Sequence, residues 1–429
     1  MSDSGWNTPR RLRALLGAML VATAILYLLG LQALKTDRAS LYTIGRDTAP
    51  NIVAAQELGA QLAGLDAELA NALLGAAADR DVANELFEMH RSSATRRLDD
   101  AAGISGASQA ERIPILVVNE ELGRYLELAG RAQWLYSQGD REGAANLLRL
   151  ATNLMHLRIL PAADALDQAN RAEMDVEFSE ARAASQRFQL GAMAAAALLL
   201  VSFVSAHAYI SLRMRRRFVP FLVAGSLLSL SFSVYLVSHL AEASEDLRVA
   251  HDDAFNSIHA LWRARAIAAD ALGDESRWLL DRLHAPEYDA AFRSKTARLY
   301  TKPPATGLIE DELRNVTFPG EDAAANQAVA NVLAFFAADT RFRELESKGS
   351  HTAAVAACIG NTEDSAFTAF DRFDEAAQRV LRINQWWFDT TMETGDRRLA
   401  RAEIVEPAFA IAIALCAWLG VRNRLKEYE

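Results

Sequence analysis

Residues 188–240 decide the fold: FQLGAMAAAALLLVSFVSAHAYISL (188–212), RMRRR (213–217) and FVPFLVAGSLLSLSFSVYLVSHL (218–240). Neither apolar run contains Asp, Glu, Lys or Arg, and each exceeds the roughly 20 residues that a helix needs to cross about 30 Å of hydrocarbon. The stretch therefore predicts a membrane hairpin. Cytoplasmic loops are rich in Lys and Arg, so we expect the basic turn on the cytoplasmic side. Its cations are Arg213, Arg215, Arg216 and Arg217.

Two further apolar runs flank this hairpin. Residues 14–34 follow a basic segment and are not followed by a small-residue cleavage site, which favours an uncleaved transmembrane helix over a signal peptide. Residues 404–421 are apolar except Glu406 and precede a basic tail. The predicted divisions are cytoplasmic 1–13, transmembrane 14–34, extracytoplasmic 35–187, transmembrane 188–212, cytoplasmic 213–217, transmembrane 218–240, extracytoplasmic 241–403, transmembrane 404–421 and cytoplasmic 422–429.

The first outer segment has the periodicity of helices. Its leucines at 58, 62, 65, 69 and 73 recur every three or four residues, as on one face of a helix. We expect a turn near 79–81, a loop at 103–106, helices over about 114–137 and from Glu142 onward, and a kink at Pro161. Strict apolar alternation is missing, so a sheet is not expected.

The second outer segment repeats this scheme. Residues 254–280 run parallel to residues 49–74, which indicates a tandem duplication. The predicted fold class is an all-α membrane protein, with four transmembrane helices carrying two extracytoplasmic antiparallel helical bundles. Phe367, Phe370 and Phe373 have helical spacing and are assigned to the bundle core.

Two polar runs in this segment are candidate contact sites. Gly273-Asp274-Glu275-Ser276-Arg277 is interpreted as a helix break, so Asp274, Glu275 and Arg277 either cap the helix or meet a partner. Nearer the fourth span lies a second run, Asn384-Gln385-Trp386-Trp387. Adjacent tryptophans point about 100° apart on a helix, so one is expected in the core and the other at a partner or membrane contact, unless both complete a wide core face.

Nothing in the sequence predicts catalysis. Nucleotide-binding, zinc-protease and serine-hydrolase motifs are missing, so we expect no enzyme and no cofactor. His251 and His259 could share a helix face, but a third metal ligand is not evident. Cys358 and Cys416 belong to an outer segment and an apolar span, so neither a disulfide nor a cysteine metal site is expected. A formal net charge of −10 argues against a nucleic-acid partner, and the charge-free first three spans argue against a transporter.

The architecture is similar to the four-helix ligand-sensing modules of chemoreceptors and sensor kinases. More specifically, the chain resembles the actinobacterial GlnX-type family of four-span membrane proteins. The resembling stretches are 49–58, 159–164, 273–281, 315–321, 369–374, 383–385 and 421–429.

This resemblance implies a function in signal transduction. In that family the gene lies beside those for a glutamine-binding-type lipoprotein and protein kinase G, which implies an extracytoplasmic solute-binding lipoprotein and a cytoplasmic Ser/Thr kinase as partners besides the lipid bilayer. An amino-acid signal would pass through the helical bundles to the kinase. Two alternatives stay open: a scaffold or assembly protein that transmits nothing, and a direct small-molecule receptor. A homodimer is also left open.

Overall fold

The computed structural model describes residues 7–103, 108–214 and 219–426. Nearly all of these residues are helical, and the only β pairing among them is an isolated bridge between Thr301 and Thr306. The all-α prediction is confirmed. In chain order, with η for π-helix, the elements are α1 (Asn7–Thr43), η1 (Ile44–Thr48), α2 (Ala49–Leu74), α3 (Ala77–Ala102), α4 (Gln109–Ser137), α5 (Arg141–Leu154), η2 (Met155–Ile159), α6 (Leu160–Met214), α7 (Pro220–Arg248), η3 (Val249–Phe255), α8 (Asn256–Leu280), α9 (Ala285–Leu299), α10 (Leu308–Arg314), α11 (Glu321–Ser347), α12 (His351–Ile359) and α13 (Ala366–Leu425).

The chain divides into two compact units. Unit 1 comprises residues 1–46, 175–250 and 389–429, and unit 2 comprises residues 47–174 and 251–388. The long helices α6 and α13 each contribute to both units.

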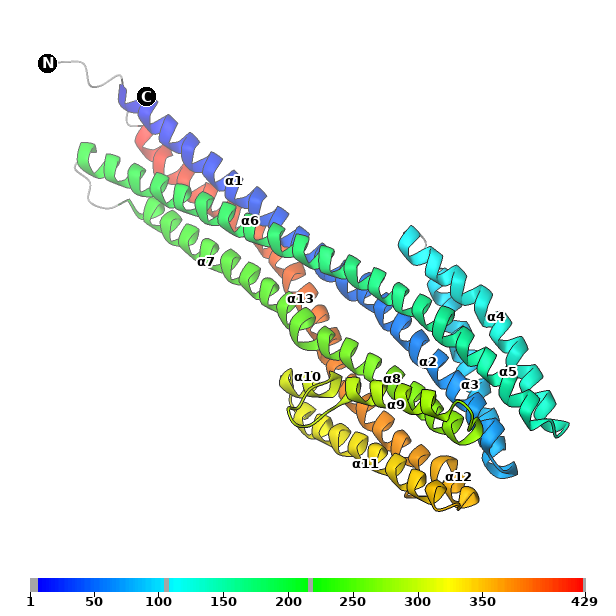
Figure 1. Cartoon of the computed structure of the whole chain (residues 1–429). Coiled ribbons are helices and arrows are strands. Elements are labelled where there is room, and N and C mark those ends of the chain that lie inside the picture. The colour runs from blue at the N-terminus through cyan, green and yellow to red at the C-terminus, as the bar shows by residue number, and fades with distance from the viewer. Residues whose placement is uncertain (1–6, 104–107, 215–218, 427–429) are drawn as a thin grey trace. The chain divides into compact units, whose positions relative to one another are not determined.

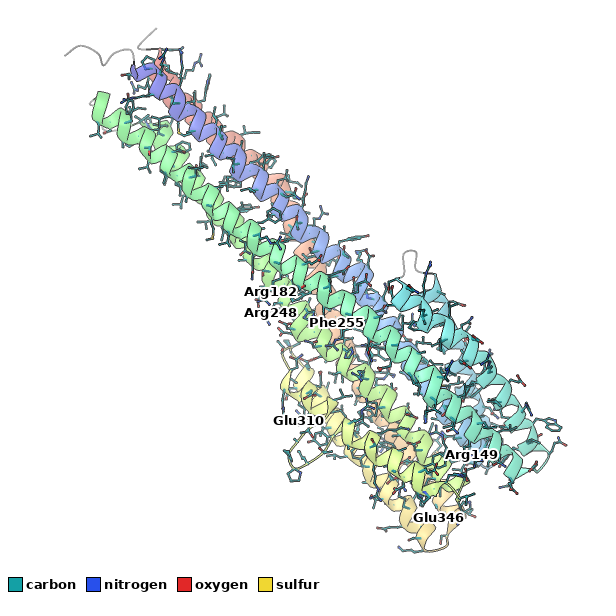
Figure 2. All side chains as sticks on the ribbon, turned by 45° about the horizontal axis from the view of Figure 1, so that its top comes forward. Arg149, Arg182, Arg248, Phe255, Glu310 and Glu346 are labelled. Carbon is teal, nitrogen blue, oxygen red and sulfur yellow. The ribbon has the colours of Figure 1, made fainter. Side chains whose placement is uncertain are left out.

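Unit 1 consists of α1, the second part of α6, α7 and the second part of α13, which run side by side (Figure 1). Four helices in the described part of the chain are long and apolar enough to cross a membrane, and they are these four. Large apolar side chains point outward from each of them, for example Leu28, Val204, Leu227 and Ile411 at 60–62 % exposure. Such a surface is unfavourable in water and suits lipid. The protein is therefore a multi-pass membrane protein.

Small residues let these helices approach closely. A side chain at Gly30 of α1 would collide with the Glu406 carboxyl of α13, and one at Gly225 of α7 would collide with Phe203 of α6. Glu406 is fully buried within unit 1. The start of α1, the end of α13 and the ends of α6 and α7 that flank the basic turn all lie at the same end of the unit (Figure 1).

Unit 2 holds two apolar cores, one for each predicted bundle. The first is built by α2 to α5, η2 and the start of α6, and contains the predicted leucine stripe of α2. The second is built by α8, α9, α11, α12 and the start of α13. Phe367 and Phe370 pack against it, and Phe373 is fully buried, which confirms their assignment to the core. Helices α2 and α8 pack against each other, so the two segments form one compact unit.

Several predicted turns need adjustment. The first turn lies at Gly75–Ala76 and not at 79–81, because α3 already begins at Ala77. Residues 104–106 of the predicted loop at 103–106 lie outside the described residues. At Pro161 the structure has the π-helix η2 just before the proline, which accommodates the residue's missing N–H. A π-helix also precedes both α2 and α8, the two helices at equivalent places in the predicted duplication.

The predicted break at residues 273–277 is wrong. Helix α8 continues from Asn256 to Leu280, and Asp274, Glu275 and Arg277 are buried in it. Gly273 has a packing reason instead: an added Cβ would lie 3.1 Å from the Ala67 backbone of α2 and 2.5 Å from the Arg277 guanidinium. The glycine lets two helices touch, and it does not end one.

Candidate functional site

A cavity of 430 Å³ lies within unit 2 between α2, η2, the start of α6, α8 and α9. Its size is in the range of small-molecule pockets, roughly 300–1,000 Å³. Apolar walls come from residues such as Ala63, Leu160 and Ile267. Polar side chains converge on it from all of these elements, so the site exists only because residues 47–174 and 251–388 pack together.

One wall of the cavity is continuous with a buried network of ion pairs, which we call the Arg277 cluster. Its members are all ionisable side chains: Asp66 of α2, His156 of η2, Asp270, Asp274 and Arg277 of α8, and Lys295 of α9. Asp270, Asp274 and Arg277 fall on one face of α8 because they are spaced by four and three residues. His156, Asp270 and Lys295 also line the cavity.

Arg277 is the centre of this cluster. Its Nη2 lies 2.5 Å from Asp66 Oδ2 and its Nη1 lies 2.6 Å from Asp274 Oδ1. The second oxygen of Asp66 accepts hydrogen bonds from Tyr125 at 3.1 Å and Thr152 at 3.2 Å. A fully buried guanidinium is thus held by carboxylates from two helices, which offsets the cost of removing it from water.

Lys295 joins the cluster to the cavity. Its Nζ lies 2.8 Å from Asp270 Oδ2 and 2.6 Å from Asp274 Oδ2, while His156 Nε2 lies 2.8 Å from Asp270 Oδ1. Burial by itself raises the pKa of Asp270, but Lys295, His156 and Arg277 together hold that pKa well below its usual range. At Asp274 burial outweighs the attraction of Lys295 and Arg277, so the pKa of Asp274 is raised.

Three other lining residues carry buried polar atoms without a partner. Both amide atoms of Gln56, the indole N–H of Trp262 and Oδ1 of Asp167 have no hydrogen bond within the described part of the chain, although these residues are only 5–8 % exposed. Leaving such groups unpaired costs about 1–3 kcal/mol each. We call Gln56, Trp262 and Asp167 the unpaired triad. A ligand that supplies both hydrogen-bond donors and acceptors would satisfy it.

The charges around the cavity have both signs. Asp164, Asp167 and Asp270 are acidic, while Arg263, Lys295 and Arg298 are basic. Asp164 and Arg263 face each other at 4.0 Å and are half exposed, which puts them at the mouth. Acidic and basic groups around one small volume suit a ligand that has both an ammonium and a carboxylate group.

The sequence-predicted residues on α8 have different positions. Asp274 and Arg277 belong to the Arg277 cluster beside the cavity. Glu275 is fully buried on another side of α8, where burial and the charge of Asp339 raise its pKa well above the usual value. None of the three caps a helix end, so the capping interpretation is wrong.

The predicted residues on α13 separate into buried and exposed ones. Asn384 is fully buried and donates a hydrogen bond of 2.5 Å to Glu321 Oε1 of α11. Trp387 stacks on Phe318 with ring centroids 5.1 Å apart, whereas Trp386 is 58 % exposed. Gln385 is half buried. One tryptophan packs and its neighbour does not, as the helix geometry predicts.

Most of the predicted basic turn lies outside the residues that the structure describes. Arg215, Arg216 and Arg217 lie outside the described residues, and the backbone of Arg213 belongs to the end of α6.

The residues that define the cavity were not identified from the sequence. Asp66 had the best indication, because it is a charged residue within the apolar stripe of α2. The sequence gives no indication of a site at Gln56, Trp262 or Lys295, because residues of these types are common in amphipathic helices. Their meeting depends on the packing of α2 against α8, which local periodicity does not encode.

Comparison with known proteins gives one match. Residues 40–179 match the family model of an actinobacterial sensor domain, which supports a sensing role for this membrane protein. The match includes Gln56, His156 and Asp167 on one side of the cavity and Asp66 of the Arg277 cluster, while the cavity residues of α8 and α9 lie beyond it. No curated protein and no solved structure matches.

Proposed function

We propose that this protein is a transmembrane sensor whose unit 2 binds a small zwitterion, such as an amino acid, in the 430 Å³ cavity. The observation that carries the proposal is the unpaired triad, whose three residues line one cavity and each hold at least one buried polar atom without a hydrogen bond within the described residues. Charges of both signs around them favour a ligand with an ammonium and a carboxylate group. The proposed action is binding and relay without catalysis.

The proposed route of the signal is the continuous helices. Helix α6 carries Asp164 and Asp167 of the cavity and continues to Met214, and α13 continues from the second core to Leu425. A ligand can shift such an element only if it binds two packings of unit 2 with different affinity. In the proposed topology, both termini and residues 213–217 are cytoplasmic and unit 2 is extracytoplasmic. The π-helices before α2 and α8 support the proposed tandem origin of the two segments.

The proposed partners follow from the resemblance given above. An extracytoplasmic solute-binding lipoprotein would deliver or report the amino acid, and a cytoplasmic Ser/Thr kinase would receive the signal. A scaffold that only holds other proteins is the alternative, but it gives no reason for unpaired polar groups in a cavity.

Ligand binding is the test of this proposal. The full-length protein in nanodiscs is titrated with each of the twenty amino acids, by calorimetry and by the shift of its melting temperature. We expect a subset to bind and to raise the melting temperature. Gln56→Leu should weaken binding at least about tenfold, because a hydrogen bond to a charged ligand is worth roughly 1.5–3 kcal/mol.

The matched control is Gln61→Leu on the same helix. Gln61 Oε1 already accepts a hydrogen bond of 2.7 Å from His90 Nδ1, and Gln61 does not line the cavity. Its variant should keep wild-type affinity. The proposal is contradicted if no amino acid binds, or if both variants lose affinity equally.

The topology has its own test. Single cysteines at Ser105 and Gly307 should react with an impermeant reagent added to intact cells, and one at Met214 should not. Labelling of Met214 from outside would reverse the proposed arrangement.

A further inference from the structure

A second hollow lies in unit 2, away from the ligand cavity. It is a groove of 1010 Å³ between the start of α11 and the part of α13 that precedes unit 1. Its α11 side is made of small residues, among them Gly320, Ala323 and Ala324. Its α13 side carries Arg379, Arg382, Ile383, Trp386 and Trp387. We call it the Trp386 groove.

Contacts outside the groove fix the part of α13 that carries its two tryptophans. Trp387 stacks on Phe318, and Asn384 one turn earlier donates to the buried Glu321 carboxylate. Trp386 meets Trp387 edge to face at 4.9 Å and leaves the rest of its ring in the open. A rigidly held, exposed tryptophan loses little entropy when a partner covers it, which is why tryptophan is frequent at the energetic centre of interfaces.

The charged residues that line the groove are all basic. Its lining contains no Asp or Glu, in a chain whose formal net charge is −10. Arg379 and Arg382 are exposed, and neither has an ion pair or a side-chain hydrogen bond among the described residues. The nearest buried acid, Glu321, is already used: Oε1 accepts from Asn384 and Oε2 accepts from the backbone N–H groups of Thr317 and Phe318.

We propose that the Trp386 groove is a docking site for an acidic segment of a protein partner. Carboxylates of that segment would pair with Arg379 and Arg382, whose planar guanidinium groups suit bidentate carboxylate contacts. An apolar side chain of the segment would lie between Trp386 and the alanines of α11. This site shares no lining residue with the ligand cavity, so it can exist whatever the cavity binds.

Lipid headgroups fit this groove less well than a protein does. Trp386 precedes the predicted fourth span by about 18 residues, which is roughly 27 Å of helix. Interfacial tryptophans that anchor membrane helices lie at the headgroup level itself. A protein that reaches the groove would instead hold α13 on the same continuous helix that crosses the membrane, and so could bias the relay.

Two synthetic peptides serve as probes. Both have twelve residues; one alternates Glu with Leu, and its twin has Lys in place of every Glu. Each is fluorescently labelled and titrated, by anisotropy, against full-length protein in nanodiscs of neutral lipid. A photoreactive amino acid at Gln327, which lines the groove, reports where the bound peptide lies.

The acidic peptide should bind at least tenfold more tightly than its basic twin and should crosslink at position 327. Arg379→Glu with Arg382→Glu should weaken binding at least tenfold, and Trp386→Ala about fivefold. The matched control reverses two other exposed arginines of unit 2, Arg96→Glu with Arg112→Glu, and should change affinity less than twofold.

Three results would overturn the proposal. Equal loss in both arginine pairs would mean non-specific attraction. Crosslinks at position 327 to a second copy of the chain would identify the groove as a dimer contact. Crosslinks to lipid in place of peptide, in nanodiscs containing an anionic phospholipid, would identify a headgroup site. Amino-acid binding measured on the same variants reports separately on the cavity.

Discussion

The Arg277 cluster and the unpaired triad are neighbours in unit 2, yet they differ in whether their buried polar atoms have hydrogen-bond or ion-pair partners. Arg277, Asp66 and Asp274 are 0–1 % exposed, and each makes an ion pair at 2.5–2.6 Å. Gln56 and Trp262 are nearly as buried, and their polar atoms have no partner within the described residues. In the Arg277 cluster, Arg277 Nε alone among the buried side-chain polar atoms has no hydrogen bond within the described residues. A largely satisfied buried network fixes the packing of helices, whereas an unsatisfied one costs stability and leaves binding capacity. We therefore assign stability to the cluster and ligand binding to the triad.

Removing the central cation of the cluster should have the largest effect. Arg277→Met leaves the Asp66 carboxylate buried without its closest cation and removes one of the two cations that pair with Asp274, which costs about 3–5 kcal/mol for a broken buried pair. We expect a lower melting temperature and less folded protein in detergent, measured by thermal and chemical denaturation.

The control for that variant is Arg282→Met. Arg282 pairs with Glu346, but its side chain is 63 % exposed, so the pair should contribute less than about 1 kcal/mol. Similar losses in the two variants would contradict the assignment of stability to the buried cluster.

Unit 2 also contains a third kind of buried polar arrangement, in which two carboxyl groups, those of Glu312 and Glu321, interact with each other. Glu312 of α10 is 1 % exposed and interacts with Glu321. Burial, together with the charge of Glu321, raises the pKa of Glu312 to about 8. Because its pKa in the folded state lies above that in the unfolded state, the stability from this group is complete below about pH 4.5 and is lost as the pH rises through about 8.

The direction of this pKa shift predicts an effect of pH on stability that is smaller than the effect of Arg277→Met. Raising the pH from 6 to 9 should lower the free energy of unfolding of the wild type by a few kcal/mol, and Glu312→Gln should remove part of that dependence. Denaturant melts at both pH values measure it. A Glu312→Gln variant with the same pH dependence as the wild type would show that the loss comes from other groups.

The sequence predicted what depends on local patterns. Long apolar runs predicted the four membrane helices, and the spacing of Leu58 to Leu73 predicted the buried face of α2. It failed at Gly273–Arg277, where glycine and charges in succession resemble a break. The charges are tolerated inside α8 because Asp66, more than 200 residues away in the chain, supplies a counter-charge, as the 211-residue separation of the Arg277–Asp66 bond shows. Pairing at that range follows from tertiary packing, which periodicity does not contain.

Replacing one unpaired and one hydrogen-bonded buried amide of α2 sharpens the comparison further. Gln56→Leu removes unpaired atoms, so the apo protein should be unchanged or about 1 kcal/mol more stable. Asn71→Leu on the same helix breaks hydrogen bonds to Glu68 at 3.1 Å and from Ser276 at 2.5 Å, and should cost about 1–3 kcal/mol. Chemical denaturation without added ligand measures both. Equal destabilisation would mean that Gln56 has a structural role after all.

The smallest effect on stability is expected at Trp386. The side chain is 58 % exposed, so Trp386→Ala should change the free energy of unfolding by less than about 0.5 kcal/mol, as for most surface substitutions. Phe373 on the same helix is fully buried, and Phe373→Ala should cost about 3–5 kcal/mol through the cavity that it leaves. Denaturation of both variants tests the contrast. If Trp386→Ala proves as destabilising as Phe373→Ala, the tryptophan is part of the core of unit 2; if it is neutral and weakens the acidic peptide, its ring is held in the open for a partner.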